Sequence, residues 1–399
     1  MSADPVPTLP MTRTCPYAPP AEHLRLRDEA PIAKVKLPNG RTVWAVTSHK
    51  HIRTILSDPR FSSNRRDPNF PTLAHERPPS SPLKPLLLEL DPPEHGAARR
   101  AVLGEFTVQR TNALGPRIQE IVDQHIDAML AGPRPVDLVQ ALALPVPSLV
   151  ICELLGVPYA DHELFQTRSA LLVGQKTPAD VIARSVGELM AYLGQLVAAK
   201  MESPTDDLLG RQIQRQREGG GVDFEGLIGL SFLLLIAGHE TTANMISLST
   251  LVLLQNPEKL AALRQDPSKT VGAVEELLRY FTIAESALGR LATEDVEIGG
   301  VLIRAGEGVL ALANTANRDP EVFENAGELD LERGSRNHLA FGFGPHQCLG
   351  QNLARLELQI VIDTLFRRIP GLRPAVPVEE LSFKDDATVY GMREFPVTW

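Results

Sequence analysis

One cysteine of this chain stands in a setting that favours metal chemistry. Cys348 lies in a glycine-rich stretch, Phe341 to Gly350, directly before a strongly helical run from Gln351 to Leu365. A thiol at a helix N-terminus meets the positive end of the helix dipole and free backbone N–H groups, so we expect its thiolate form to be favoured. Gly344 and Gly350 place no side chain between these amides and the sulfur. A thiolate shielded in this way can bind iron and donate electron density to it, although a lone cysteine is more often an inert core residue.

A second group of polar residues interrupts an apolar helix. Asp223 can cap a helix that runs to about Gln255, a length of roughly 50 Å at 1.5 Å per residue. Near its middle, aliphatic residues give way to Gly-His-Glu-Thr-Thr at Gly238–Thr242. Glycine weakens a helix and threonine hydroxyls can bond preceding carbonyls, so we expect a kink that opens backbone groups to water or a ligand. A solvent-facing polar turn would explain His239 but not the whole block, because apolar residues flank it.

The composition indicates one globular unit. The chain has 399 residues, 43% of them apolar, with a net charge of −9 and no linker or repeat, so we expect a single domain over residues 1–399 with a flexible, proline-rich segment at 1–20. No basic cluster supports a nucleic-acid partner, and three distant cysteines support neither a disulfide framework nor a structural zinc. The longest apolar run, Phe232–Ala237, is too short to span a membrane, and residues 1–20 do not resemble a signal peptide. We therefore expect a cytoplasmic monomer without a membrane partner.

Helical spacing dominates the chain. Apolar residues recur at helical intervals from about Glu94 to Asn256. The elements that spacing and turn residues predict are a strand at Arg41–Val46 after the Asn39-Gly40 turn, an irregular segment at Arg60–Pro93, helices at Asp223–Gln255, Lys269–Tyr280 and Gln351–Leu365, and a hairpin at Val296–Ile303. The expected fold is mainly α with a minor β portion.

The thiol loop resembles the haem-ligand loop of the cytochrome P450 family. The family's pattern of Phe, two residues, Gly, three residues, Cys, one residue and Gly is filled by Phe341, Gly344, Cys348 and Gly350. The resemblance implies haem b with Cys348 as the axial ligand of its iron. It also implies the family's fold, a triangular helical prism with small β-sheets and one long helix across the distal face of the haem.

The polar block of the long helix resembles the family's oxygen-binding motif. Carried over, Gly238 makes room for O2, and Thr241 and Glu240 form an alcohol–acid pair that relays protons to the iron site. The resemblance therefore gives Thr241 and Glu240 a role in catalysis rather than in packing.

Further motifs of the family recur in the same order. Glu276 and Arg279 match its Glu-x-x-Arg pair, with Arg333 where the third member is expected, although by spacing alone they would be a weak surface pair. At the family's usual proline this chain has Ala326. The residues that the resemblance assigns to the haem carboxylates are His95, Arg99, Arg290 and His346. The matches run from about Glu94 to the C-terminus.

The resemblance implies a haem-thiolate monooxygenase of the soluble, actinobacterial class. It would use O2 to hydroxylate an unactivated C–H bond of a bulky lipophilic secondary metabolite, a polyketide macrolide or polyene. The chain carries no flavin or nicotinamide fingerprint, so electrons would come from an iron–sulfur ferredoxin and its reductase. The residues that the resemblance places around the substrate are Leu234, Ala237, Ile283, Ala284, Leu288, Thr388 and Val389.

Other functions compete with this one. A steroid-like, terpenoid or xenobiotic substrate would suit the same aliphatic pocket. A haem protein that senses or sequesters a ligand would need the thiol loop but no proton relay, and a peroxide-using relative would dispense with the acid–alcohol pair. A cysteine hydrolase built on Cys348 and His346 is disfavoured, because two residues on one loop are a poor geometry for nucleophile and base.

Overall fold

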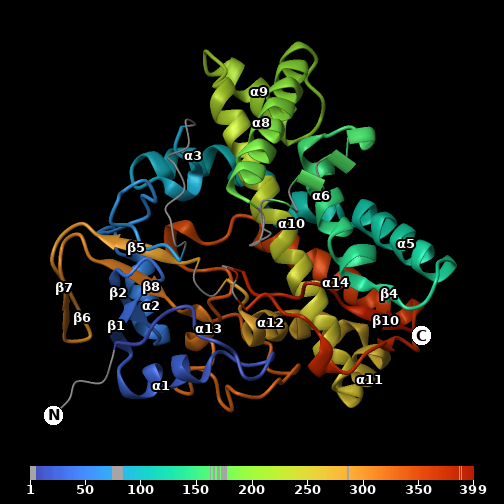
Figure 1. The fold of residues 1–399 in the computed structure, drawn as a ribbon. Helices are drawn as coiled ribbons and strands as arrows, with labels where there is room; N and C mark the ends of the chain where they lie inside the picture. Colours follow the sequence, from blue (N-terminus) through green and yellow to red (C-terminus); the bar gives the residue numbers. More distant parts are fainter. Residues whose placement is uncertain are drawn as a thin grey trace.

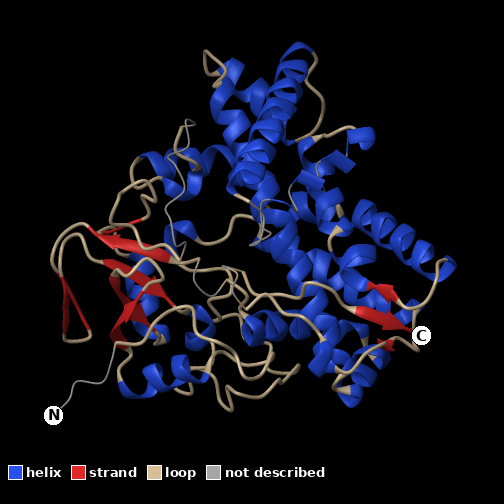
Figure 2. Cartoon of the chain, viewed as in Figure 1, coloured by secondary structure: helices blue, strands red, loops and turns tan. Residues whose placement is uncertain are grey.

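Helices form most of the molecule, and a smaller β-rich region lies at one side (Figure 1, Figure 2). The computed structural model describes residues 6–73, 84–161, 163–164, 167–168, 171, 178–284, 287–385, 387 and 389–399. The helix α10 (Phe224–Leu254) crosses the whole molecule diagonally, and the outline around it is roughly triangular in this view. The expectation of a mainly α fold with small sheets is confirmed.

The remaining helices surround α10 or support the sheets. They are α1 (Ala21–Glu29), α2 (His49–Ser57), α3 (Glu94–Leu103), α4 (Val108–Ala113), α5 (Gly115–Ala131), α6 (Pro145–Leu155), α8 (Ala179–Glu202), α9 (Leu208–Glu218), α11 (Pro257–Gln265), α12 (Thr270–Phe281), α13 (Ala313–Ala316) and α14 (Gln351–Arg368). α10 packs against α6, α8, α12 and α14, so its apolar residues form the centre of the main core.

Three small sheets account for the strands. The strands are β1 (Ile32–Lys36), β2 (Thr42–Val46), β3 (Phe61–Ser62), β4 (Val136–Asp137), β5 (Gly289–Ala292), β6 (Val296–Ile298), β7 (Val301–Ile303), β8 (Gly308–Ala311), β9 (Arg373–Pro374) and β10 (Pro396–Thr398). The largest sheet has the order β1-β2-β8-β5-β3 and is antiparallel except for β2 and β8, where Trp44 pairs with Val309. The others are β4-β10-β9 and the hairpin β6-β7.

The predicted elements agree closely with the observed ones. Asp223 caps α10 by accepting a hydrogen bond from the Gly226 N–H at 3.1 Å, as its position predicts. β2, α12, α14 and the β6-β7 hairpin lie within a few residues of the predicted bounds, and Gly299 and Gly300 have the positive φ of 56° and 80° that the hairpin turn needs. The expected kink does not interrupt the helix, which continues unbroken through Gly238–Thr242.

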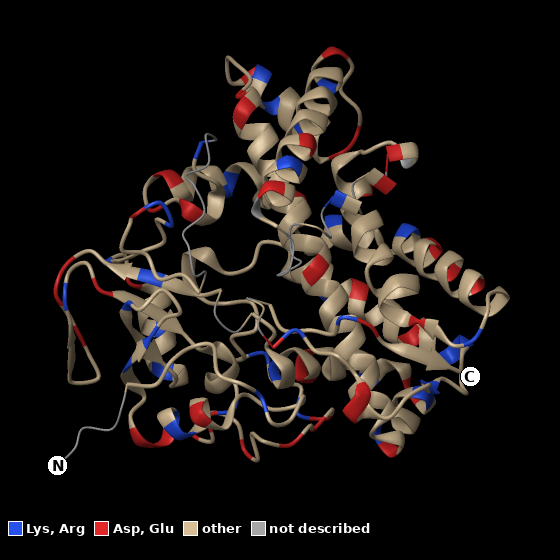
Figure 3. Cartoon of the chain, in the orientation of Figure 1, with Lys and Arg blue, Asp and Glu red and all other residues tan. Residues whose placement is uncertain are grey.

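α10 is the one helix among the described residues that is long and apolar enough to cross a membrane by length and composition alone. However, 67% of its most apolar window is buried inside the protein, as in the core helix of a soluble protein. Basic and acidic residues are both spread over the molecule in this view, and no large region carries one sign alone (Figure 3).

Candidate active site

A cavity of about 370 Å³ lies between α10, α3 and the segment that leads into α14. The predicted site residues that line it are Leu234, Ala237, Gly238, Thr241, Ile283, Ala284, Leu288, His95, Arg99, Arg290, Phe341, His346, Cys348 and Gly350. Glu240, Gly344 and Val389 do not line it, and Thr388 lies outside the described residues. Residues from distant parts of the chain therefore meet here, as the resemblance implies.

The thiol loop is held by its own backbone and by α2. The Cys348 N–H donates to the Phe341 carbonyl at 2.8 Å, which closes the loop on itself. Gly344 has a φ of 74°, and a Cβ there would lie 2.6 Å from the Leu56 carbonyl oxygen at the end of α2. Glycine is therefore required at 344 both for its conformation and for the space.

The acidity of the Cys348 thiol differs from the expectation. Burial of the group raises its pKa, and the Gly350 N–H and the charges of Arg99 and Arg355 only partly counter this effect. The helix N-terminus is therefore not enough by itself to offset the effect of burial on this thiol. Yet Cys348 has accessible surface, and that surface faces the cavity. A cation in the cavity would supply the missing counter-charge.

Two histidine rings lie against each other, tilted by 31°, at one edge of the cavity. The rings of His95 and His346 have centroids 3.8 Å apart. Burial, reinforced by the charges of neighbouring arginines, lowers the pKa of both, that of His346 to about 3, so both rings are neutral at pH 7. The buried Nε2 of His95 has no hydrogen-bond partner among the described residues.

Arginines gather beside these histidines. Arg99 donates to the Gln347 carbonyl at 2.6 Å, and burial lowers the pKa of Arg290 to about 10. Arg65, which the sequence reasoning missed, joins them from the irregular segment and donates to the Ala287 carbonyl at 3.0 Å. No motif marks Arg65, because the Ala287 carbonyl that it binds lies 222 residues away in the sequence.

Among the described lining residues, Glu357 is the only acid. Burial raises its pKa to about 8, so it is largely protonated at pH 7. The guanidinium groups therefore face no ionised acid on the part of the wall that the structure describes. Such a wall fits a ligand that brings its own carboxylates, because buried charges require partners.

The polar block of α10 divides between the cavity and the core. Thr241 lines the cavity and donates its Oγ1 hydrogen to the Ala237 carbonyl at 2.8 Å, as expected for a threonine inside a helix. Gly238 lines the cavity as well, and an added Cβ would meet the Ile151 side chain at 2.6 Å, so glycine here also admits α6. His239 is buried and bonds the Leu235 carbonyl, so the alternative of a solvent-facing turn does not hold for this residue either.

Glu240 points away from the cavity. Its Oε1 accepts a hydrogen bond from Lys384 Nζ at 2.9 Å, and the carboxylate is 8% exposed. The acid and the alcohol of the predicted pair are thus consecutive residues that face different directions.

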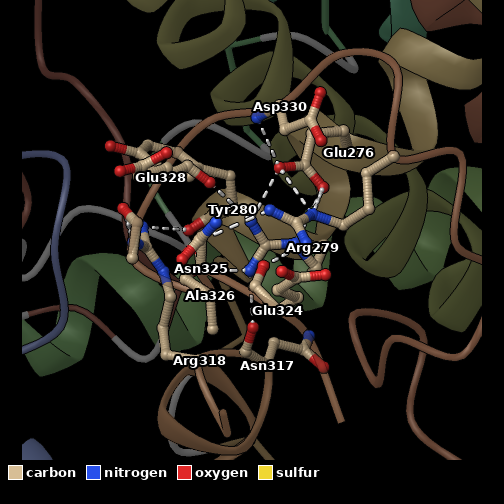
Figure 4. A network of polar contacts seen from close by, with 12 residues as sticks. Glu276, Arg279, Tyr280, Asn317, Arg318, Glu324, Asn325, Ala326, Glu328 and Asp330 are labelled. Carbon is tan, nitrogen blue, oxygen red and sulfur yellow. Dashed lines mark hydrogen bonds and ion pairs between the residues drawn. The ribbon is translucent and has the colours of Figure 1, made fainter.

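The Glu276–Arg279 pair is completely buried (Figure 4). The two side chains form paired hydrogen bonds of 2.7 Å, and Arg279 also donates to the carbonyls of Asn317, Ala326 and Glu328. Arg333 reaches Glu276 at 3.2 Å, where the third member was predicted. At Ala326 the carbonyl accepts from Arg279 at 2.9 Å although the family's proline is absent. The spacing alone predicted a weak surface pair, whereas in the folded protein the two residues form a completely buried ion pair.

A neighbouring acid, Glu275, carries a second network that the sequence did not reveal. Burial alone would raise its pKa, but hydrogen bonds from His338 and Arg355 outweigh this and hold the pKa at about 2. Arg355 also lies over the ring of Phe341, 4.6 Å from its centroid. Glu275 therefore ties α12 to α14 and to the thiol loop. Its partners lie 63 and 80 residues away, which no local motif signals.

The chain is similar in sequence and in structure to known proteins. Residues 194–369 match the family model described as Cytochrome P450. The chain is 50% identical to the vitamin D3 dihydroxylase of Streptomyces griseolus over 98% of its own length and 97% of the relative's. The crystal structure of cytochrome P450 MoxA from Nonomuraea recticatena is similar with a TM-score of 0.93, 58% identity and 98% coverage of both chains.

Two solved structures with bound ligands are also similar. One is the mycinamicin VIII C21 methyl hydroxylase MycCI from Micromonospora griseorubida bound to mycinamicin VIII, with a TM-score of 0.92, 40% identity, and coverage of 99% of this chain and 100% of the other. The second is CYP105P1 in complex with filipin I, with a TM-score of 0.92, 44% identity and 99% coverage of both chains.

Proposed function

The chain belongs to the cytochrome P450 family, and we propose that it hydroxylates an unactivated C–H bond of a bulky lipophilic metabolite, a polyketide macrolide or polyene. As a P450 monooxygenase it takes the family's haem-thiolate iron cofactor. The observation that carries the substrate proposal is the cavity beside Cys348, whose wall away from the arginines is made mainly of aliphatic side chains.

The lining residues suit a haem. Cys348 presents the one cysteine sulfur on the described wall, and we assign it to the iron. The residues that would hold the haem carboxylates are Arg99, Arg290, the adjacent His95 and His346, and Arg65. The orphaned Nε2 of His95 is explained if one of these carboxylates is its partner.

The haem supplies, when bound, the activation of O2 and its insertion into a C–H bond. The chain's part is to orient the substrate, exclude water and deliver protons. Leu234, Ala237 and Leu288 form an apolar wall that keeps bulk water from the reacting carbon. Of the predicted acid–alcohol pair, Thr241 is the member that lines this wall. We assign its hydroxyl to the last step of proton delivery and Glu240 to the step before it.

We infer that electrons arrive from a separate iron–sulfur ferredoxin. The described elements are all accounted for by the helical fold and its small sheets, and the sequence has no dinucleotide fingerprint. Arg355, whose charge acts on the Cys348 sulfur, is held by Glu275, and we propose that the donor approaches the thiolate near this pair.

A second substrate class has support from one comparison. The relative named as a vitamin D3 dihydroxylase shares half of this chain's residues. A steroid-like substrate therefore remains the alternative to a macrolide.

Spectral titration of the purified haem protein tests the substrate proposal. We expect filipin I or mycinamicin VIII to produce a type I shift, because a bulky apolar guest displaces water from the cavity. Ala237→Phe, which places a ring into the cavity, should weaken this binding at least about tenfold through overpacking of roughly 1–3 kcal/mol. The same exchange at the exposed Ala261 of α11 should leave the binding unchanged. A stronger response to vitamin D3 than to both polyketides would favour the steroid alternative, and no response to any of the three would contradict both.

A further inference from the structure

A lysine far along the chain holds the acid of the α10 polar block. Lys384 Nζ donates to Glu240 Oε1 at 2.9 Å and to Asn244 Oδ1 at 3.0 Å. Glu240 and Asn244 are one helical turn apart on α10, so a single ammonium group binds two side chains of the same helix face. The Lys384 side chain is 16% exposed and that of Glu240 only 8%, so this is a largely buried pair with one end near water.

The position of Lys384 is fixed by a short antiparallel segment near the C-terminus. Lys384 N–H donates to the Gly391 carbonyl at 2.9 Å, and Phe383 pairs with Met392. Any Cβ on Gly391 would collide with the Asn244 side chain, so glycine lets this segment approach α10 closely. The adjoining Tyr390 N–H donates to the carbonyl of Ile283, a residue of the cavity wall. The segment thus touches both the acid and the substrate cavity.

Lys384 decides where the Glu240 carboxylate lies. A buried carboxylate needs a counter-charge, and Lys384 supplies it on the side away from the cavity. Thr241, the neighbouring residue, faces the cavity. A proton can pass from the acid to the alcohol side only when the Glu240 side chain leaves Lys384 and turns.

We propose that Lys384 is a positioning residue for proton delivery, which rests on the monooxygenase function proposed above. Glu240 waits as a carboxylate on Lys384, near water. It takes one proton from water as the bond to Lys384 opens, turns, and gives that proton up at the Thr241 side. It then returns to Lys384 as a carboxylate. The net transfer is one solvent proton into the cavity, and Lys384 stays charged throughout.

The test measures where reduced oxygen goes. The haem-loaded protein is supplied with ferredoxin, reductase and NADPH. Reduced oxygen leaves as hydrogen peroxide when proton delivery is impaired, and as water or hydroxylated product when proton delivery is intact. We expect Lys384→Met to raise the peroxide fraction about fivefold and to change the solvent isotope effect on NADPH oxidation, with or without filipin I. Lys384→Arg should restore both within about twofold, since the charge is kept. The matched control is Lys269→Met, which removes a 2.8 Å lysine–carboxylate pair that is exposed.

A readout apart from turnover tests the contact itself. In a double-mutant cycle, the losses in melting temperature caused by Lys384→Met and Glu240→Gln should not add, because each removes the same pair. The proposal is overturned if Lys384→Met leaves the peroxide fraction and the isotope effect unchanged, or if Lys384→Arg behaves like Lys384→Met. Failure of the proposed function would look different, because the wild-type protein would then reduce no oxygen with ferredoxin.

Discussion

Replacing Cys348 by alanine is expected to abolish the red-shifted Soret band of the reduced, carbon-monoxide-bound protein and to bring hydroxylation down to background. The expectation follows from the wall of the cavity, where Cys348 is the one cysteine among the described lining residues. Arg99 and Arg290 remain in the variant, so haem can still be retained without the thiolate. The measurement is the reduced carbon-monoxide difference spectrum, with haem content determined alongside it.

Cys152 provides the matched control for this experiment. It is a buried cysteine of α6 whose pKa burial raises to about 12, so it is an inert thiol. Cys152→Ala should keep the red-shifted band, with at most a modest loss of stability from the small cavity. A red-shifted band that persists in Cys348→Ala would contradict the assignment of Cys348 as the iron ligand.

Arg279→Met should have the largest effect on stability. The exchange removes the main partner of the buried Glu276 carboxylate, which keeps only Arg333 and the Asp330 N–H, and it leaves the carbonyls of Asn317, Ala326 and Glu328 without this donor. Breaking a buried pair from one side costs about 3–5 kcal/mol, a large part of the roughly 5–15 kcal/mol that stabilises a typical domain. We expect a lower midpoint of chemical unfolding and poor haem incorporation.

Two further variants separate this network from a general effect of losing charge. Glu276→Leu combined with Arg279→Met should unfold at a higher denaturant concentration than Arg279→Met alone, because the fully buried carboxylate is then removed together with its main partner. Arg25→Met removes an exposed arginine that pairs with Glu22 and Glu29, and its midpoint should match the wild type. A midpoint for Arg279→Met equal to that of Arg25→Met would refute the structural role.

The features that the sequence predicted correctly are the elements encoded by local spacing. The cap at Asp223, the helix that follows Cys348 and the hairpin turn at Gly299–Gly300 each depend on a few neighbouring residues, where glycines, caps and helical intervals leave a readable pattern. The placement of His95, Arg99, Arg290 and His346 around one cavity came only from the family's motif, since nothing local brings them together.

The parts that the sequence did not reveal depend on contacts between distant segments. Lys384 meets Glu240 across 144 residues, and Arg355 meets Glu275 across 80. The Glu240 side chain turns toward the counter-charge of Lys384, and the position of that charge depends on the assembled fold. The effect of burial on the pKa of Cys348 is hidden from the sequence for a similar reason, because helix-end effects are local whereas burial depends on the assembled fold.

The tight fit of Gly344 against the Leu56 carbonyl has a consequence for laboratory evolution. The end of α2 packs directly against the thiol loop and restricts its conformation, although almost 300 residues separate the two segments in sequence. A library that randomises residues 343–347 should return glycine alone at 344 among haem-loaded clones, while the exposed Pro345 should vary freely. Attempts to tune the iron by redesigning this loop must therefore redesign α2 with it, because the two segments share one surface.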